Sequence, residues 1–283
     1  MTSVYILFQR LLPRFLLGRL VYRLSRIRTP WFKNALIRGF VRLYAVDVSE
    51  AERPVPEGYS SFNDFFTRRL LPGTRPMDPA PDCLCSPADG TVQQAGTIRD
   101  GRLIQAKGMH YTVAALLGDE RAQSDYDGGN FLTVYLAPHD YHRVHAPAAG
   151  RLRRMLYVPG DRLAVNRRTA MAVPGLFAGN ERLVCEFDTP DWTFSVVLVG
   201  ALNVSSISTA WAGEVLPVEP RWPRRWLYSG QARVALDRGD YLGHFNLGST
   251  VILLFPPGAV ALAPELSPGR KLRVGERVGQ LIE

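Results

Sequence analysis

From Cys83 to the C-terminus, the sequence consists of short apolar runs separated by glycine and proline, and this pattern constrains the fold most. Apolar runs of roughly 4–8 residues that are bounded by turn residues are typical of strands. With 283 residues, 46% of them hydrophobic, the chain can also bury a sizeable core. The sequence therefore predicts a β-rich body, and we expect strands at residues 131–136, 152–158, 183–187, 194–199 and 251–255.

Residues 1–46 have a different character. They contain nine basic residues and no acidic one, whereas the whole chain has a formal charge of +8, which leaves −1 for everything after residue 46. Aromatic and aliphatic residues alternate with these charges, and Pro13 and Thr29-Pro30 divide the segment. We expect a short helix before Pro13, a second helix to about Arg26, and a third that begins with Thr29 as N-cap. Together with the strands, this predicts an α+β fold.

Basic amphipathic helices of this kind bind anionic bilayers through their apolar faces and their Lys and Arg side chains. No apolar run in residues 1–46 approaches the ~20 residues of a membrane-spanning helix, so the segment is expected to lie on a membrane surface. The alternative that the helices only pack on the protein core stays open. A signal peptide is a poorer interpretation, because Arg10, Pro13 and Arg14 interrupt the apolar stretch.

The sequence after this segment suggests a connection and then a docking element. Residues 52–58, rich in proline and charge, are expected to be a linker, and residues 62–66 are expected to form a short helix or turn against the core. We therefore divide the chain into a basic helical membrane-binding region, residues 1–48, and a β-rich catalytic domain, residues 49–283.

The bond between Gly248 and Ser249 has the chemistry of a peptide bond that could break itself. It places a hydroxyl nucleophile beside an unhindered carbonyl, immediately before the apolar run 251–255. The Ser249 Oγ could attack the Gly248 carbonyl in an N-to-O acyl shift, and elimination from the ester would leave a dehydroalanine that hydrolyses to a pyruvoyl group. Alone, a Gly-Ser-Thr tripeptide is a weak signal, and a simple turn entering a strand is the alternative.

An autocleaving serine needs a base and an orienting carboxylate, and both residue types are present. Three of the five histidines, His139, His142 and His145, follow the run 131–136, and histidine titrates near neutral pH. Upstream, Asp89 stands in an Asp-Gly turn. Asp89 could equally be a turn residue, and the histidines could form a metal site or a solvated loop.

Taken together, these segments resemble the phosphatidylserine decarboxylase family over almost the whole chain. Several motifs occur in family order, and their number makes a chance match difficult. They are Phe62–Leu70, Arg75-Pro76, Ser86–Val92, Gln105–Gly108, Asp140–His145, Leu176–Arg182, Val199–Ala201 and Leu247–Val251.

The resemblance implies a role for each matching residue. Asp89, His145 and Ser249 match the family's self-cleavage triad, so His145 would take the Ser249 Oγ proton and Asp89 would orient the imidazole. Cleavage between Gly248 and Ser249 would give a large chain, 1–248, and a small chain, 249–283, whose Ser249 becomes the pyruvoyl group. His142 matches the histidine of the decarboxylation step, in which phosphatidylserine bound as a Schiff base becomes phosphatidylethanolamine.

The same resemblance implies a body like the compact barrel-like sandwiches of lipoyl domains, a homodimer, and a peripheral position on the cytoplasmic side of the cell inner membrane. Anionic membrane would be a partner and nucleic acid would not, because the basic residues are confined to one segment. We assign no catalytic role to His139, and structural or surface roles to His110 and His244.

Other cofactors and functions are less consistent with the sequence. The chain has three lysines, none beside a phosphate-binding glycine loop, which disfavours pyridoxal phosphate. Cys83, Cys85 and Cys185 lack zinc spacing, so we expect no metal. A membrane-associated Ser-His-Asp lipid hydrolase that uses Ser249 without chain cleavage is the alternative, although the usual Gly-x-Ser-x-Gly elbow is absent. A non-catalytic membrane-binding protein would need none of the His and Asp motifs.

Overall fold

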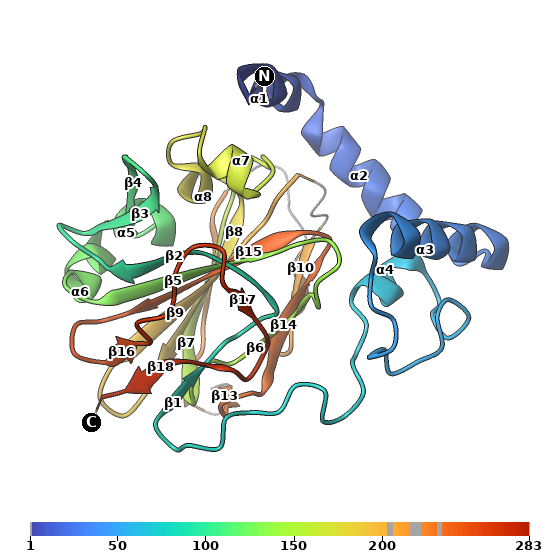
Figure 1. The fold of residues 1–283 in the computed structure, drawn as a ribbon. Helices are drawn as coiled ribbons and strands as arrows, with labels where there is room; N and C mark the ends of the chain where they lie inside the picture. The colour runs from blue at the N-terminus through green and yellow to red at the C-terminus, as the bar shows by residue number, and fades with distance from the viewer. Residues whose placement is uncertain (1, 203–205, 216–221, 231–233, 283) are drawn as a thin grey trace.

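The computed structural model describes residues 2–202, 206–215, 222–230 and 234–282 of the chain. Figure 1 shows three helices extending away from a body built of sheets, with short helices at its periphery. The predicted α+β fold with a β-rich body is confirmed. The helices are α1 (Thr2–Leu11), α2 (Arg14–Ser25), α3 (Pro30–Tyr44), α4 (Phe62–Phe66), α5 (Val113–Leu117), α6 (Gln123–Tyr126), α7 (Arg167–Ala170) and α8 (Leu176–Gly179), with a 3-10 turn at Glu120–Ala122.

The largest sheet forms the centre of the body. Within the described residues its order is β12-β7-β8-β9-β15-β5-β2-β17, with β13 also paired to β7, and it stays open because β12 and β17 are its two ends. The body is therefore a stack of open sheets and not a closed barrel. The strands are β2 (Gly90–Thr97), β5 (Asn130–Leu136), β7 (Gly150–Val158), β8 (Arg182–Asp188), β9 (Thr193–Val199), β12 (Arg224–Leu227), β13 (Ala235–Leu236), β15 (Ser249–Phe255) and β17 (Lys271–Leu272).

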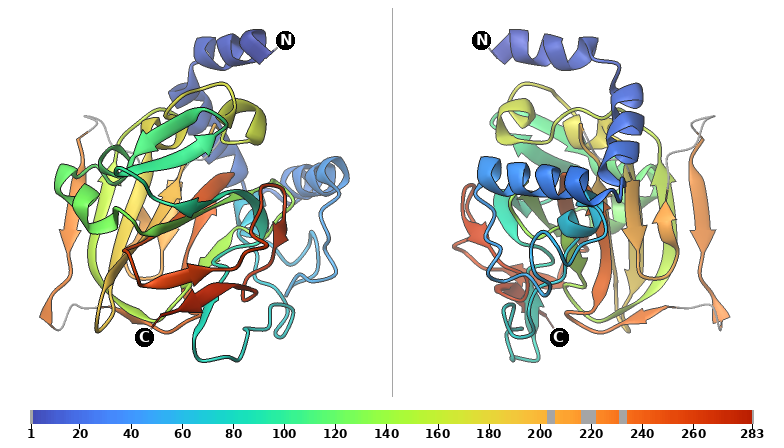
Figure 2. Two further views of the ribbon diagram at one scale, coloured as in Figure 1. Left: turned by 60° about the vertical axis from the view of Figure 1, so that its left-hand side comes forward. Right: turned by 90° about the vertical axis from the view of Figure 1, so that its right-hand side faces the viewer.

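Three smaller sheets complete the body, and two views of their arrangement are given in Figure 2. The strand order is β11-β10-β14-β6 in one and β1-β18-β16 in another, and β3 pairs with β4. Each predicted strand is present and extends by one or two residues beyond its predicted start or end. The strands are β1 (Cys83–Cys85), β3 (Arg102–Ala106), β4 (Met109–Thr112), β6 (Arg143–His145), β10 (Ser206–Thr209), β11 (Gly213–Val215), β14 (Tyr241–Asn246), β16 (Val260–Leu262) and β18 (Arg277–Leu281).

The three N-terminal helices follow the predicted boundaries. Pro13 separates α1 from α2, and Pro30 is the first residue of α3. Thr29 occupies the N-cap position as expected, but its side chain accepts no hydrogen bond from the helix. No helix in the described part of the chain is long and apolar enough to cross a membrane.

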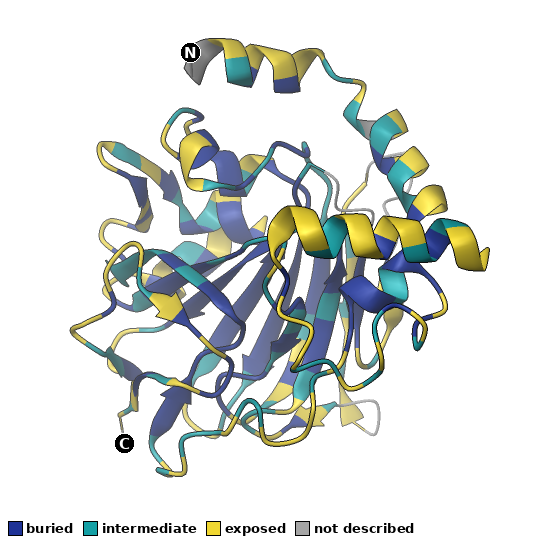
Figure 3. Ribbon diagram, turned by 45° about the vertical axis from the view of Figure 1, so that its right-hand side comes forward, coloured by how far each residue is buried: buried dark blue, intermediate teal, exposed yellow. Residues whose placement is uncertain are grey.

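Much of the apolar surface of α1 to α3 faces solvent, as the exposed residues of Figure 3 show. Only a few side chains anchor these helices, among them Ile6 of α1 and Ile37 of α3. Ile37 and Val46 share a small hydrophobic cluster with Phe65, Phe66 and Leu247, so α3 and α4 are packed together beside the start of β15.

The expected linker at residues 52–58 is an ordered loop. The Glu52 amide donates to the Arg69 carbonyl at 3.0 Å, and Arg53 forms an ion pair with Asp64 at 2.6 Å. Val55 packs against the cluster that contains Phe65. The prediction of a linker is therefore wrong: proline sets the turns of this loop, and side-chain contacts hold it against α4.

Candidate active site

Ser249 is the first residue of β15, at the centre of the large sheet. The run from Val251 to Phe255 is buried on both faces, as expected for a continuously apolar strand with neighbours on each side. β15 pairs with β9 and with β5, where Ser249 lies opposite Leu136. The sheet therefore fixes the position of the Ser249 backbone.

The turn that enters this strand has unusual backbone angles. Leu247 has φ 87° and Gly248 has φ 59°, both in the region that favours glycine. For Leu247 this conformation costs about 1–3 kcal/mol, and it persists because the side chain is held in the cluster with Phe65 and Phe66. Apart from its two chain neighbours, no heavy atom of the described residues lies within 4 Å of where a Cβ on Gly248 would be, so the space beside that residue is open.

The Ser249 side chain is buried without a hydrogen bond. Its exposed fraction is 1%, and its Oγ has no partner among the described residues. A buried hydroxyl without a partner forfeits the hydration it had in water, so such groups are uncommon and often functional. No described group therefore holds the Ser249 hydroxyl in place.

His142 lies next to α4 and is fully buried. Its ring stacks on Phe66 with centroids 4.0 Å apart, and in the described part of the chain neither ring nitrogen has a hydrogen-bond partner of good geometry. Burial, together with the nearby Arg68 guanidinium, lowers the pKa of His142 to about 3. The imidazole is therefore neutral at physiological pH.

His145 has a defined tautomer because of its two hydrogen bonds. Its Nδ1 lies 2.8 Å from the Gly239 carbonyl oxygen, which can only accept, so Nδ1 carries the proton. Nε2 consequently holds a lone pair and accepts from the Tyr141 hydroxyl at 3.2 Å. Burial lowers the pKa of His145, which keeps the ring in the neutral form that a general base requires.

Asp89 is buried and engaged by a guanidinium. Arg75 Nε lies 2.9 Å from each carboxylate oxygen, and the Val274 amide donates to Oδ1 at 2.9 Å. The described hydrogen bonds of Asp89 therefore do not reach His145, whose Nδ1 is held by Gly239. The orienting role of Asp89 stays a prediction.

Strand pairing explains why the segments that carry these residues lie close together. Thr91, just after Asp89, lies opposite Tyr135, and Tyr135 also lies opposite Thr250. The chain that continues from β5 carries His142 and His145, and β6 then pairs with β14, which leads into Ser249. The sequence motifs contained the histidines and Ser249 but gave no sign of the Gly239 carbonyl or of Tyr141 as a histidine partner. Arg75 could have been found, because it belongs to one of the quoted motifs.

The remaining histidines lie outside this group or at its edge. His139 is exposed with its Nε2 3.5 Å from Asp140, and His110 is also exposed. His244 is half-buried and hydrogen-bonded to Tyr241.

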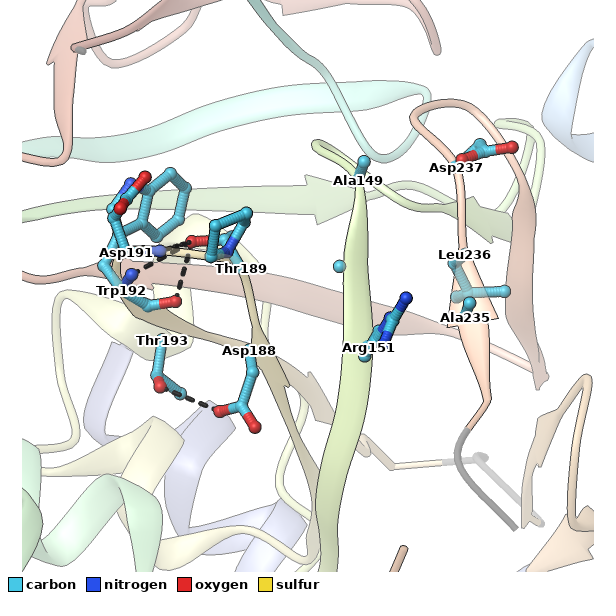
Figure 4. Close-up of a pocket in the computed structure, with 12 residues that line it drawn as sticks. Ala149, Arg151, Asp188, Thr189, Asp191, Trp192, Thr193, Ala235, Leu236 and Asp237 are labelled. Atoms are coloured by element: carbon cyan, nitrogen blue, oxygen red, sulfur yellow. Dashed lines mark hydrogen bonds between the residues drawn. The ribbon is translucent and has the colours of Figure 1, made fainter. Parts of the chain in front are cut away.

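Two hollows differ in their relation to Ser249. One, of about 730 Å³, is lined by residues such as Asp188, Trp192 and Asp237 (Figure 4) and lies at the start of β9. The other end of β9, at Val199, is the end that pairs with Thr250, so this hollow lies away from Ser249. The other, of about 310 Å³, is lined by Asp89, Tyr141 and Arg68. The smaller hollow is the one that adjoins the candidate site, and we call it the Arg68 pocket.

Comparison with known proteins gives a consistent family. The family model described as phosphatidylserine decarboxylase matches residues 62–280, and a second model, described as PSD, matches residues 4–45. The chain is 51% identical over 280 residues, covering 98% of both chains, to a protein of Azotobacter vinelandii named phosphatidylserine decarboxylase proenzyme. Proteins of the same name from Methylococcus capsulatus and Pseudomonas fluorescens are 49% and 48% identical, and the alignments cover 96% and 98% of this chain and 94% and 96% of theirs. The chain is thus a member of the phosphatidylserine decarboxylase family.

Proposed function

We propose that this protein is a decarboxylase that converts phosphatidylserine to phosphatidylethanolamine with a pyruvoyl group made from its own Ser249. One observation supports this most directly: the buried, unpartnered Ser249 hydroxyl follows a strained turn at Leu247 and Gly248. Family membership supplies the reaction, and the relatives' name "proenzyme" fits a chain that must be processed.

Self-cleavage would use the chain's own side chains. Ser249 Oγ attacks the Gly248 carbonyl carbon and gives up its proton to His145 Nε2, which holds the required lone pair. The C–N bond then breaks, and the Ser249 nitrogen takes a proton as the ester forms. Elimination of the Gly248 carboxylate leaves dehydroalanine. Water then hydrolyses the dehydroalanine, which releases its nitrogen as ammonia and leaves the ketone of the pyruvoyl group.

In turnover, the pyruvoyl carbonyl supplies an electron sink for the pair left by departing carbon dioxide. The chain's own contribution is positional. His142 is buried against Phe66 and is neutral in the free protein, so in the substrate complex it would take up a proton before delivering one to the carbon that loses carbon dioxide. The same burial excludes water from competing for that position.

A peripheral membrane position supports access to a lipid substrate. Helices α1 to α3 expose large apolar side chains, including Phe8 (61%) and Trp31 (74%), beside basic residues such as Arg10 and Arg28. This combination suits adsorption to an anionic bilayer. The cytoplasmic face of an inner membrane and a homodimer are proposed with it, on the strength of the family resemblance.

The first test is the intact mass of the denatured protein beside a Ser249→Ala variant. Cleavage after Gly248 would divide the 31.6 kDa chain into fragments of about 28 and about 4 kDa, and the smaller one should carry a borohydride-reducible carbonyl. Ser249→Ala and His145→Ala should remain whole. His142→Ala should be cleaved and yet release no carbon dioxide from phosphatidylserine.

The lipid-hydrolase alternative predicts a different result. A hydrolase would stay in one piece, lose activity on Ser249→Ala and release fatty acid or headgroup instead of carbon dioxide. An uncleaved wild-type chain under maturing conditions would therefore refute the pyruvoyl proposal.

A further inference from the structure

The segment from Asn63 to Arg68 borders the candidate active site along its length. Asn63 Nδ2 donates to Asn246 Oδ1 at 2.9 Å, just before the strained turn. Phe66 stacks on His142, and the Thr67 carbonyl accepts from Arg143 Nε at 2.9 Å. Arg68, the next residue, is thus brought to the same region as His142.

Arg68 is a buried cation with most of its donors unused. Its exposed fraction is 3%, and Nε and Nη1 have no hydrogen-bond partner among the described residues. Nη2 makes a single long bond of 3.3 Å to the His139 carbonyl, and the guanidinium lies 5.2 Å from the Phe65 ring centroid. No ion pair of Arg68 with a carboxylate occurs in the described part of the chain. A buried guanidinium in this state is costly unless an anion joins it.

The Arg68 pocket contains carboxylates, but other groups already engage them. Asp89 and Glu50 both bind Arg75, at 2.9 Å and 2.7 Å. Asp47 accepts from Ser49, and Asp140 accepts from the Ala137 amide at 2.7 Å. Lys271 and Arg273 add further positive charge to the lining. Among the residues that line this roughly 310 Å³ pocket, Arg68 has the buried donors without a described partner, and the shape of its guanidinium matches a phosphate or carboxylate.

We infer that Arg68 is a substrate-binding residue that receives the phosphodiester of the lipid headgroup. This inference rests on the proposed function. Phosphatidylserine brings two anions, but the carboxylate loses its charge in the reaction. A cation on the carboxylate would stabilise the substrate more than the transition state and so slow the reaction. The phosphodiester keeps its charge throughout, and only two carbons and an oxygen separate it from the reacting amine.

The decisive measurement is binding to the uncleaved Ser249→Ala protein, which needs no pyruvoyl group. We would titrate glycerophosphoethanolamine, which has the phosphodiester but no carboxylate, and inorganic phosphate, by calorimetry. Glycerophosphoethanolamine should bind, and Arg68→Gln should weaken it at least tenfold, whereas Arg69→Gln, at the exposed neighbouring position, should bind as the parent does. Inorganic phosphate should bind more weakly and lose its affinity in the same variant.

Folding is checked separately from binding. If Arg68 is held for a ligand, the ligand-free Arg68→Gln protein should unfold at the same or a higher temperature, and the cleavable form should still self-cleave. In decarboxylation, Arg68→Gln should raise KM more than it lowers kcat, and Arg68→Lys should recover part of the loss.

Three results would overturn the inference. Equal affinity of Arg68→Gln and Arg69→Gln for glycerophosphoethanolamine would show that Arg68 does not contact the phosphodiester. If glycerophosphoserine, which has the carboxylate, bound through Arg68 and glycerophosphoethanolamine did not bind, Arg68 would be assigned to the carboxylate. A large loss of thermal stability in Arg68→Gln would make the residue structural. Cleavage failure of the wild type would refute the proposed function, while phosphodiester binding by Ser249→Ala would stand.

Discussion

Burial keeps several histidine side chains near the candidate site neutral. It is the main cause that lowers the pKa of His142 to about 3 and of His244 to about 4, and it lowers the pKa of His145 as well. The positive charge of Arg143 acts in the same direction on His145 and His244. Folding therefore holds these rings in the form that accepts a proton.

This arrangement predicts a loss of stability in mild acid. The unfolded chain binds protons at these histidines once the pH falls below about 6.5, while the folded chain does not, so the free energy of unfolding should fall as the pH drops from 6.5 toward 4. Each such histidine contributes at most about 1.4 kcal/mol per pH unit in this window. Urea unfolding of Ser249→Ala at several pH values measures the slope.

A variant isolates the contribution of one ring. His142→Asn should flatten the slope between pH 6.5 and 4, and His110→Asn, at an exposed position, should leave it unchanged. Identical slopes in all three proteins would contradict a neutral buried His142.

At this scale the sequence predicts residue types better than contacts. His142, His145, Asp89 and Ser249 could be selected because each stands in a motif, and strand pairing does bring the segments that carry them close together. The Arg75 contact with Asp89 crosses fourteen positions and depends on how the chain between α4 and β2 packs, which no local pattern encodes.

At the scale of elements, α1 holds the segment before and within α7. Gln9 is 1% exposed, and its Oε1 accepts from the Ala164 amide at 2.9 Å while its Nε2 donates to Thr169 Oγ1 at 3.4 Å. Tyr5 of the same helix accepts from Asn166 at 3.1 Å. Two polar side chains thus tie a helix with an exposed apolar face to the body of the protein.

Gln9→Ala should loosen this connection. It leaves the Ala164 amide without its partner, which costs roughly 1–3 kcal/mol for a buried group and less where water can enter. We expect a lower unfolding temperature and faster hydrogen exchange in residues 161–170, measured by mass spectrometry. Arg10→Ala, at the exposed neighbouring position, should change neither the unfolding temperature nor the exchange rate. Equal hydrogen exchange in the two variants would show that Gln9 does not hold residues 161–170 in place.

The helices and strands themselves were predictable because their signals are local. Pro13 and Thr29-Pro30 mark helix boundaries, and continuous apolar runs mark central strands. The strand order was not predictable, since it depends on pairings such as β15 with β9 that join distant segments. Residues 52–58 were misassigned as a linker for the same reason, because the contact of Arg53 with Asp64 is a tertiary one.

For the whole molecule, charge and apolar surface are concentrated at one end of the chain. Residues 1–46 have nine basic and no acidic residues, although Arg14 and Arg26 form ion pairs with Asp161 and Glu214 of the body. Two of these arginines therefore orient the helices on the body, and exposed ones such as Arg10 remain available to a surface of opposite charge.

Replacing two exposed aromatic residues should weaken membrane binding. Phe8→Ala with Trp31→Ala removes apolar area that would enter the bilayer, and burial of one such side chain is worth about 1.5–3 kcal/mol, so the partition coefficient on anionic vesicles should fall more than tenfold. Vesicle sedimentation measures it. Leu227→Ala, 71% exposed on β12, is the matched control, and equal losses would contradict a specific membrane face on α1 to α3.

The place of β15 has a consequence for the lifetime of the protein. If the chain is cut before Ser249, the 35-residue C-terminal piece remains part of the fold: its β15 is the central strand between β9 and β5, and its β18 pairs with β1. Folding must then precede the cut, and what began as an intramolecular process becomes an association of two molecules. Once the mature form is denatured, its two chains would have to find each other again, at a rate that depends on their concentrations. Each molecule would therefore fold efficiently only once, before the cut.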